Sequence, residues 1–427
     1  MDKILNLFRI RDLRNKILIV FGLLVVFRIL AAIPLPNIDT EALRSVFSGN
    51  QLLGFLNLLS GGGLSNLSIA MLGVGPYITA TIIMQLLTMI FPNLKKMYYE
   101  EGAAGRAKFN RLSRYITVPL AALQGYGFLN LLTSQNVLPA HLSLFATVLN
   151  VVIITAGTVV LMWLGELISE QKIGNGISLI IFAGIVSGLP QNLQVAWLNY
   201  QTTGPAMLPT LIAFVAVSIV VIAGVVFINE GERKVPISYA RRVRGNKMFG
   251  GVSSYLPLKV NQAGVIPIIF AISILLFPQF LGQIVAAFST SASLFITKYT
   301  ALFLENQIMY GLAYFFLVVV FTYFYTAVTF DPAEISKNLQ RSGGFIPGIR
   351  PGESTGEFLK KIINRTTISG ALFLGLIAVL PNITQYFTGA GQPSIGGTAL
   401  LIVVAVALET MRQIDSQLTI REYEGFK

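Results

Sequence analysis

The sequence predicts an all-α polytopic membrane protein with ten membrane-spanning helices. Of its 427 residues, 54% are hydrophobic and only 12% are charged, whereas a soluble domain carries about 25% charged residues. Ten separate segments are apolar over about the 20 residues that a helix needs to cross a membrane. The basic residues gather on one side of these segments, as is typical of proteins that cross a membrane many times.

The ten predicted spans follow one another along the whole chain. The fifth is short and begins within "GNGIS", so it could be buried in the helix bundle. The predicted ranges are 17–36, 74–91, 115–133, 143–166, 175–190, 208–228, 263–281, 308–329, 366–386 and 397–413.

The distribution of lysine and arginine fixes the orientation of the spans. With ten spans, both termini lie on the same side of the membrane, and 28 of the 31 basic residues fall on that side. Only Arg44 and Lys298 fall on the other side, and Arg28 lies inside the first span. Because basic loops stay in the cytoplasm, both termini are predicted to be cytoplasmic.

Two halves of five spans each follow from this topology. They comprise residues 1–200 and 205–427, with the division near Gly204. Because five is odd, the second half enters the membrane upside down relative to the first. The second span of each half is interrupted by glycine and proline, in "GVGPYITATII" and "NQAGVIPIIFA", which is typical of inverted repeats with a functional path between them.

A short apolar segment precedes the second span and does not resemble a span itself. Residues Gly61 to Leu72 are interrupted by serine and asparagine and flanked by glycines on both sides. A helix of that length reaches less than about 20 Å, too little for a hydrocarbon core of about 30 Å. The sequence therefore predicts a hinged, semi-polar half-helix beside the second span.

The spans carry almost no internal charge. A charge at mid-membrane costs about 2.5–3.5 kcal/mol on insertion scales, so Arg28 either reaches a polar neighbour or belongs to a relay, and the sequence leaves both open. Uncharged polar residues remain, and their pattern indicates either ordinary hydrogen bonding between helices or a weak polar latch. The residues of this polar set that recur below are Gln85, Gln124 and Asn261.

The residues that catalysis requires are not evident in the sequence. The chain has no cysteine and one histidine, and it contains no phosphate-binding loop and no Ser/His/Asp set. We therefore expect neither an enzyme nor a bound cofactor or metal.

Two cytoplasmic loops, 229–262 and 330–365, are much longer than connections need to be. Both are basic and rich in glycine and proline. The stretch "VPISYARR" followed by Gly-Asn suggests a hairpin tip carrying Arg241, Arg242 and Arg244, and "GFIPGIRPG" suggests an ordered turn. Attraction to anionic lipid needs only charge, so ordered loops of this size fit a large docking partner with acidic or phosphate surfaces better.

Five long motifs resemble the bacterial SecY family, the main subunit of the Sec protein-conducting channel. They are "GPYITATIIMQLLT", "EQKIGNGISLIIFAGIVSGLP", "LPLKVNQAGVIPIIFA", "GFIPGIRPGEST" and "GGTALLIVVAVALE". They occur in order along essentially the whole chain. The loop at 92–114 matches the family only loosely, and the C-terminal tail is short.

The resemblance implies roles for particular residues. The half-helix is similar to the family's plug, which blocks the closed pore, with residues Gly61, Leu64, Asn66, Ile69 and Leu72. The pore ring of aliphatic side chains would comprise Ile78, Ile82, Ile177, Ile181, Ile266, Ile269 and Ile402. The second and seventh spans resemble a lateral gate, with Gln85, Gln124 and Asn261 as its polar latch. Arg241, Arg242 and Arg350 match positions that dock partners.

The function that the resemblance implies is a passive protein-conducting channel in the bacterial plasma membrane. It would pass unfolded polypeptides across the membrane and release hydrophobic segments, such as signal sequences, sideways into lipid. The implied partners are the small subunits SecE and SecG, the motor ATPase SecA, the ribosome, nascent polypeptides and membrane lipids. A secondary transporter built on inverted repeats is the alternative.

Overall fold

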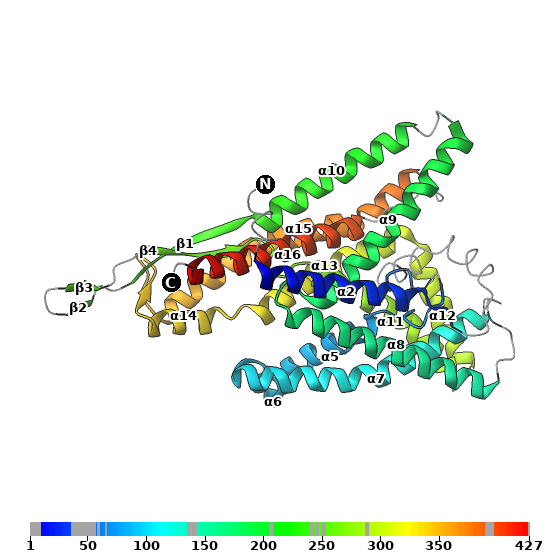
Figure 1. Cartoon of the computed structure of the whole chain (residues 1–427), viewed down its shortest axis with the longest axis horizontal. Coiled ribbons are helices and arrows are strands. Elements are labelled where there is room, and N and C mark those ends of the chain that lie inside the picture. The colour runs from blue at the N-terminus through cyan, green and yellow to red at the C-terminus, as the bar shows by residue number, and fades with distance from the viewer. Residues whose placement is uncertain are drawn as a thin grey trace. The chain divides into compact units, whose positions relative to one another are not determined.

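The protein is described by a computed structural model (Figure 1). The described residues are 10–35, 57, 60–64, 66–134, 138, 143–204, 208–239, 242–244, 247–249, 253–286, 290–388 and 397–425. The chain forms two compact units. Unit 1 comprises Met1–Pro209, Leu276–Glu305 and Val406–Lys427, and unit 2 comprises Thr210–Leu275 and Asn306–Ala405. Unit 1 combines the first predicted half with parts of the second, whereas unit 2 lies wholly within the second. The division into two sequential halves stays a prediction.

Each of the ten predicted spans coincides with one helix. These helices are α2 (Arg11–Ala32), α5 (Gly75–Ile90), α7 (Gly102–Ser134), α8 (Leu144–Glu170), α9 (Gly176–Thr203), α10 (Leu208–Glu230), α11 (Ile266–Ala286), α13 (Gln307–Thr329), α15 (Glu353–Thr388) and α16 (Gly397–Gly425). Within the described residues, five helices are long and apolar enough to cross a membrane, or six if a bent pair is one span. That pair is Gly75–Thr88 with Pro92–Tyr99, bent by 109°.

The helix ends follow local sequence signals. Pro76 lies in the first turn of α5, where its missing N–H is not needed. Asn175 caps α9, its side-chain oxygen accepting a hydrogen bond of 3.2 Å from the backbone N–H of Ser178. The short fifth span was predicted to end at residue 190, but α9 continues through Pro190 to Thr203.

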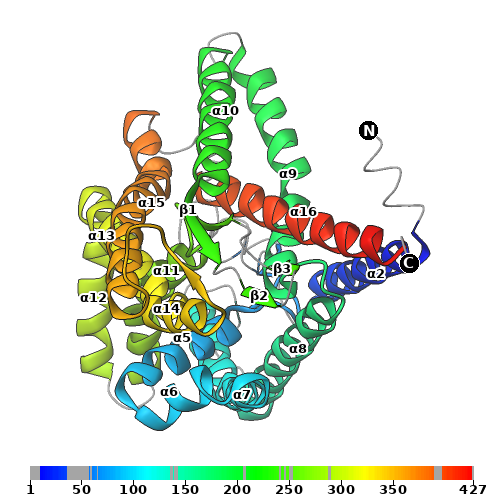
Figure 2. The same cartoon turned by 90° about the vertical axis from the view of Figure 1, so that its left-hand side faces the viewer.

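Within unit 1, helices α7 and α8 lie side by side (Figures 1 and 2). Arg114 of α7 and Glu166 of α8 form an ion pair, with Nε and Oε1 2.6 Å apart. These two residues lie at helix ends that the sequence assigns to the same side of the membrane. The ion pair therefore fits the opposite directions in which the third and fourth spans are predicted to cross the membrane.

Two further helices complete the described part of unit 1. Helix α6 (Pro92–Tyr99) follows α5, and α12 (Thr290–Glu305) follows α11. The sequence did not predict α12, because its 16 residues include Lys298 and are too few for a span. The Ser293 hydroxyl donates a hydrogen bond of 2.8 Å to the Gly282 carbonyl, which ties α12 to the end of α11.

The two long loops of unit 2 are joined by a small β-sheet that the sequence did not predict. Strand β1 (Glu232–Tyr239) pairs antiparallel with β4 (Ser253–Lys259) from the same loop and with β5 (Gly344–Phe345) from the other. Beyond them, β2 (Arg242–Arg244) and β3 (Lys247–Phe249) form a hairpin (Figure 1). Helix α14 (Pro332–Arg341) lies in the second loop. We call this sheet, its hairpin, α14 and the turn at residues 346–352 the docking platform, after the role predicted for its arginines.

Candidate functional site

The predicted half-helix is a chain of turns over its described residues, 60–64 and 66–74. Backbone hydrogen bonds close these turns, including Ser68 N–H to the Gly63 carbonyl at 2.8 Å and Gly73 N–H to the Ala70 carbonyl at 2.8 Å. Positive φ values at Gly61 (67°) and Gly73 (56°) place a glycine where other residues would be strained, at each end of the segment. The segment is thus bounded by glycines in positive-φ conformations, and it is not a regular helix. That these glycines act as hinges stays a prediction.

We call residues 60–64 and 66–74 the plug segment, after their predicted role. This segment is hydrogen-bonded to the end of the first span. The N–H of Leu35 donates to the Leu67 carbonyl at 2.8 Å, and the N–H of Ile69 donates to the Ile33 carbonyl at 3.0 Å. Pro34 and Ser68 form an isolated antiparallel bridge. These contacts join the plug segment to the chain that follows α2 without a helix.

The apolar side chains of the plug segment are buried in unit 1. Leu64, Leu67 and Met71 are at most 1% exposed and share a hydrophobic cluster with residues of α7 and α8. The cluster also contains Leu35, Phe128, Leu129, Leu132, Leu138 and Ile154. Of the predicted plug residues, Gly61 and Leu64 are buried, Ile69 and Leu72 are half-buried, and Asn66 is exposed. The predicted plug is therefore seated against helices, with one polar side chain outward.

The predicted pore ring is divided between the two units. Ile78 and Ile82 lie on α5 and Ile177 and Ile181 on α9, all in unit 1. Those of unit 2 are Ile266, Ile269 and Ile402. Four of the seven are buried, namely Ile82, Ile181, Ile269 and Ile402, and the other three are half-buried. The ring as a whole stays a prediction.

Ile177 also has a packing role that its sequence position did not reveal. A Cβ at Gly165 of α8 would lie 2.5 Å from the Cδ1 of Ile177, so this side chain fills the space that the glycine leaves. Ser169 strengthens the same junction, because its hydroxyl donates to the Gly165 carbonyl and accepts from the Gly176 N–H, each at 2.9 Å. Helices α8 and α9 are thereby held closely at the start of α9.

The predicted gate residues have different surroundings. The Oε1 atom of Gln85 is buried and has no hydrogen-bond partner in the described part of the chain, and Gln124 on α7 is half-buried. The side-chain amide of Asn261 donates to Oδ1 of Asn229 at 2.8 Å and to the Gly264 carbonyl at 3.3 Å. The sequence did not identify Asn229, whose contact with Asn261 joins the end of α10 to the start of α11. The latch remains a prediction.

Two of the three predicted docking arginines lie within the described residues. Arg242 and Arg244 lie on β2, while Arg241 lies outside the described residues. The side chain of Arg350 is exposed, and its carbonyl accepts a hydrogen bond of 2.9 Å from the Thr355 hydroxyl. The Ser336 hydroxyl donates to the Gly352 carbonyl, which fixes the same turn to α14. "GFIPGIRPG" is therefore an ordered turn, as predicted.

A hydrophobic core packs against the strands of the platform. It joins residues of β1 and β4 with residues of the second loop and of α15, which follows it. Its buried members are Val235, Leu258, Ile346, Leu359 and Ile363. The sequence treats the two long loops as separate docking elements, whereas the structure shows that they share one core.

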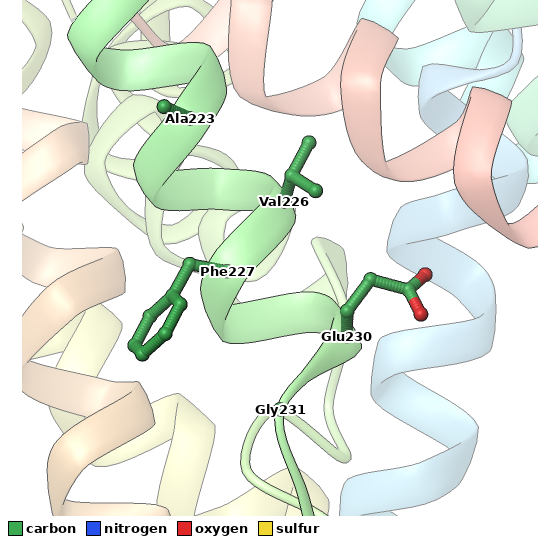
Figure 3. Close-up of a pocket in the computed structure, with 5 residues that line it drawn as sticks. All are labelled: Ala223, Val226, Phe227, Glu230 and Gly231. Carbon is green, nitrogen blue, oxygen red and sulfur yellow. The ribbon is translucent and has the colours of Figure 1, made fainter.

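An open pocket of about 610 Å³ lies at the end of α10, and Figure 3 shows its lining. Ala223, Val226, Phe227, Glu230 and Gly231 line it, and Phe227 and Glu230 point to different sides of the helix. Sites for small polar molecules usually combine an apolar lining with a few convergent polar groups. The pocket is open, and its lining offers one charged side chain and no convergent polar set, so it gives no support to a solute site.

Comparison with known proteins identifies the family. The SecY family model matches residues 68–411. The chain belongs to the SecY family. It is 41% identical to the protein translocase subunit SecY of Streptomyces galbus, over 98% of each chain, and 39% identical to that of Mycobacterium bovis, over 97% of each chain. As a member of this family it is a multi-pass membrane protein and a protein-conducting channel, which confirms the reading of the five motifs.

Solved structures share the fold at lower identity. A protein-conducting channel matches with a TM-score of 0.62 and 20% identity, over 93% of this chain and 90% of that one. Sec61 in the canine ribosome–channel complex from the endoplasmic reticulum matches with a TM-score of 0.60 and 19% identity, over 93% and 90%. A SecY structure in which the plug domain stabilises the closed state and maintains a membrane seal matches with a TM-score of 0.61 and 20% identity, over 92% and 90%.

Proposed function

We propose that the resting channel is sealed by the plug segment together with a ring of isoleucines. The observation that carries this proposal is the burial of Leu64, Leu67 and Met71 against α7 and α8, directly before α5. A seal that must open needs a segment that can leave its seat, and the glycines at its two ends supply the required backbone freedom. An apolar constriction loses water and so resists ions. It also offers no charges that would hold a passing polypeptide.

In this proposal, unfolded polypeptides cross through the channel, and hydrophobic segments leave sideways into lipid through a gate formed by the second and seventh spans. Gln85, Gln124 and Asn261 act as weak polar contacts of that gate. Interhelical hydrogen bonds in membranes contribute about 0.6 kcal/mol each, so such contacts can part without a large barrier. The chain itself needs no catalytic group, since its partners supply the energy.

The docking platform is proposed to bind the partners that drive transport, the motor ATPase SecA and the translating ribosome. An exposed arginine on a supported turn suits carboxylate or phosphate, because its guanidinium forms two parallel hydrogen bonds with either group. Arg241, Arg242 and Arg350 would make these contacts. The small subunits SecE and SecG are proposed to bind within the membrane, and signal sequences and lipids at the gate.

The proposed location is the bacterial plasma membrane, with both termini in the cytoplasm. The charge bias of the loops supports this orientation. The ion pair between Arg114 and Glu166 joins two helix ends assigned to the same side, so it supports the relative directions of these two spans.

The experiment that tests the proposed function is reconstitution into vesicles with SecE, SecG, SecA and ATP. We expect a secreted precursor to become protected from protease inside the vesicles, and vesicles lacking the chain to protect none. A solute transporter would instead accumulate a small molecule along an ion gradient without SecA. Solute uptake in the absence of any precursor protection would contradict the channel and favour the alternative.

A further inference from the structure

Arg28 is a half-buried cation inside the apolar helix α2, and the sequence left its role open. Its guanidinium donates a hydrogen bond from Nη1 to the carbonyl of Gly61, at the start of the plug segment. Within the described residues, Arg28 belongs to none of the three ion pairs. A charged side chain in a span is retained when it has a specific partner, and here that partner is plug backbone.

The nature of this partner decides between the two readings of Arg28. A relay needs a neighbouring group that can take up and release a proton, and a backbone carbonyl does neither. The same carbonyl is a good fixed acceptor, and a hydrogen bond from a charged donor is stronger than one between neutral groups. The contact therefore holds the plug segment in position rather than moving protons.

Two glycine contacts show that the plug is fitted closely to its surroundings in unit 1. A Cβ at Gly157 of α8 would overlap the carbonyl oxygen of Ile69, so the plug backbone lies directly against this bare position. A Cβ at Gly61 would overlap the ring of Phe27 and would lie 3.1 Å from the Cα of Gly184. Phe27 precedes Arg28 in α2 and is 0% exposed. The plug segment therefore packs closely at two positions that lack a side chain, Gly157 of α8 and its own Gly61.

We propose that Arg28 and Gly157 are positioning residues that hold the plug in its closed seat. Arg28 fixes the first hinge through the Gly61 carbonyl, and Gly157 allows the plug backbone to approach α8. This inference rests on the proposed function of the plug segment as a seal and adds the contacts that keep it closed. Opening requires the Arg28 contact to break and the segment to rise from Gly157.

The absence of cysteine from the sequence provides a clean test. Ser68 is 0% exposed within the plug segment, so Ser68→Cys places one thiol where it reacts only when the plug has moved. In reconstituted vesicles, the rate of labelling by a membrane-impermeant maleimide then reports the population of the displaced plug. We expect Arg28→Met and Gly157→Ala each to raise this rate about tenfold, the effect of losing one strong hydrogen bond or its equivalent.

Matched variants separate the loss of these plug contacts from nonspecific effects of a substitution on folding. Gly188→Ala on α9 adds the same methyl group where nothing lies within 4 Å, and it should leave the labelling rate unchanged. Arg28→Lys keeps a charged donor and should recover part of the slow rate. A labelling rate for Arg28→Met within about twofold of the parent protein, at equal abundance, would overturn the role of Arg28.

A second readout distinguishes a contact that restrains the plug segment from a purely structural role of Arg28. If Arg28 restrains the plug, Arg28→Met should increase translocation of a precursor whose signal sequence has been weakened, whereas a folding defect would lower it. Decreased translocation of that precursor would contradict the proposal. The parent protein is tested in the same vesicles. Failure of the parent to translocate any precursor would count against the proposed function and not against the role of Arg28.

Discussion

Channels in which Ile82 and Ile181 are both replaced by asparagine are expected to conduct ions at rest. The two side chains are 4% and 1% exposed, and they belong to the predicted apolar ring. Asparagine brings hydrogen-bonding groups that retain water in a constriction, and a hydrated constriction passes ions. An increase of about tenfold in resting conductance needs a barrier only about 1.4 kcal/mol lower. Planar-bilayer recording of the purified channel measures this directly.

Two controls make this result specific. Replacing the same residues by valine keeps the constriction apolar and should leave the resting conductance low. Deleting residues 62–72 removes the plug segment from its hydrophobic cluster and should also raise the conductance. If the asparagine variant folds normally and conducts no more than the parent channel, Ile82 and Ile181 do not form the seal.

Replacing Arg350 by lysine is expected to reduce partner-driven translocation about tenfold, nearly as much as Arg350→Glu. The turn that carries Arg350 lies between Pro347 and Pro351 and is held by the Thr355 hydroxyl, so the guanidinium is presented on stiff backbone. Lysine keeps the charge but cannot form the paired hydrogen bonds of arginine. Loss of one charge-assisted hydrogen bond costs about 1.5 kcal/mol, which corresponds to about tenfold in affinity.

The measurement is export of a precursor driven by SecA and ATP, together with binding of non-translating ribosomes. Lys337→Glu changes the charge of another exposed basic residue on the platform and serves as the control for bulk electrostatics. Full activity of Arg350→Lys in both assays would leave Arg350 as a topology signal only.

The sequence predicted the helices well because hydropathy is a local property. All ten predicted spans coincide with helices, although α9 extends past Pro190. Helix α12 was missed because 16 residues with an internal lysine fall between a loop and a span. The helix expected between Gly61 and Leu72 was wrong in detail, since positive φ values at Gly61, Gly62 and Leu67 bend the backbone into turns.

Contacts between residues far apart in the chain could not be predicted from the sequence. Strand β5 pairs with β1 across about 100 residues of chain, and a two-residue strand has no periodicity to recognise. The partner of Arg28 is the backbone of Gly61, and backbone partners leave no mark in a residue pattern. The close approach at Gly157 had only a weak signal, a small residue within an apolar span.

A polypeptide is expected to pass through the interior of this chain. The most direct measurement is disulfide cross-linking between a stalled precursor carrying one cysteine and single cysteines placed in this naturally cysteine-free chain. Ile181→Cys tests the predicted ring, and Val152→Cys, on an exposed position of α8, is the matched control. We predict that the precursor cross-links at position 181 and not at position 152. Cross-linking at position 152 alone, or none at 181 while the precursor is protected from protease, would contradict a path through the ring.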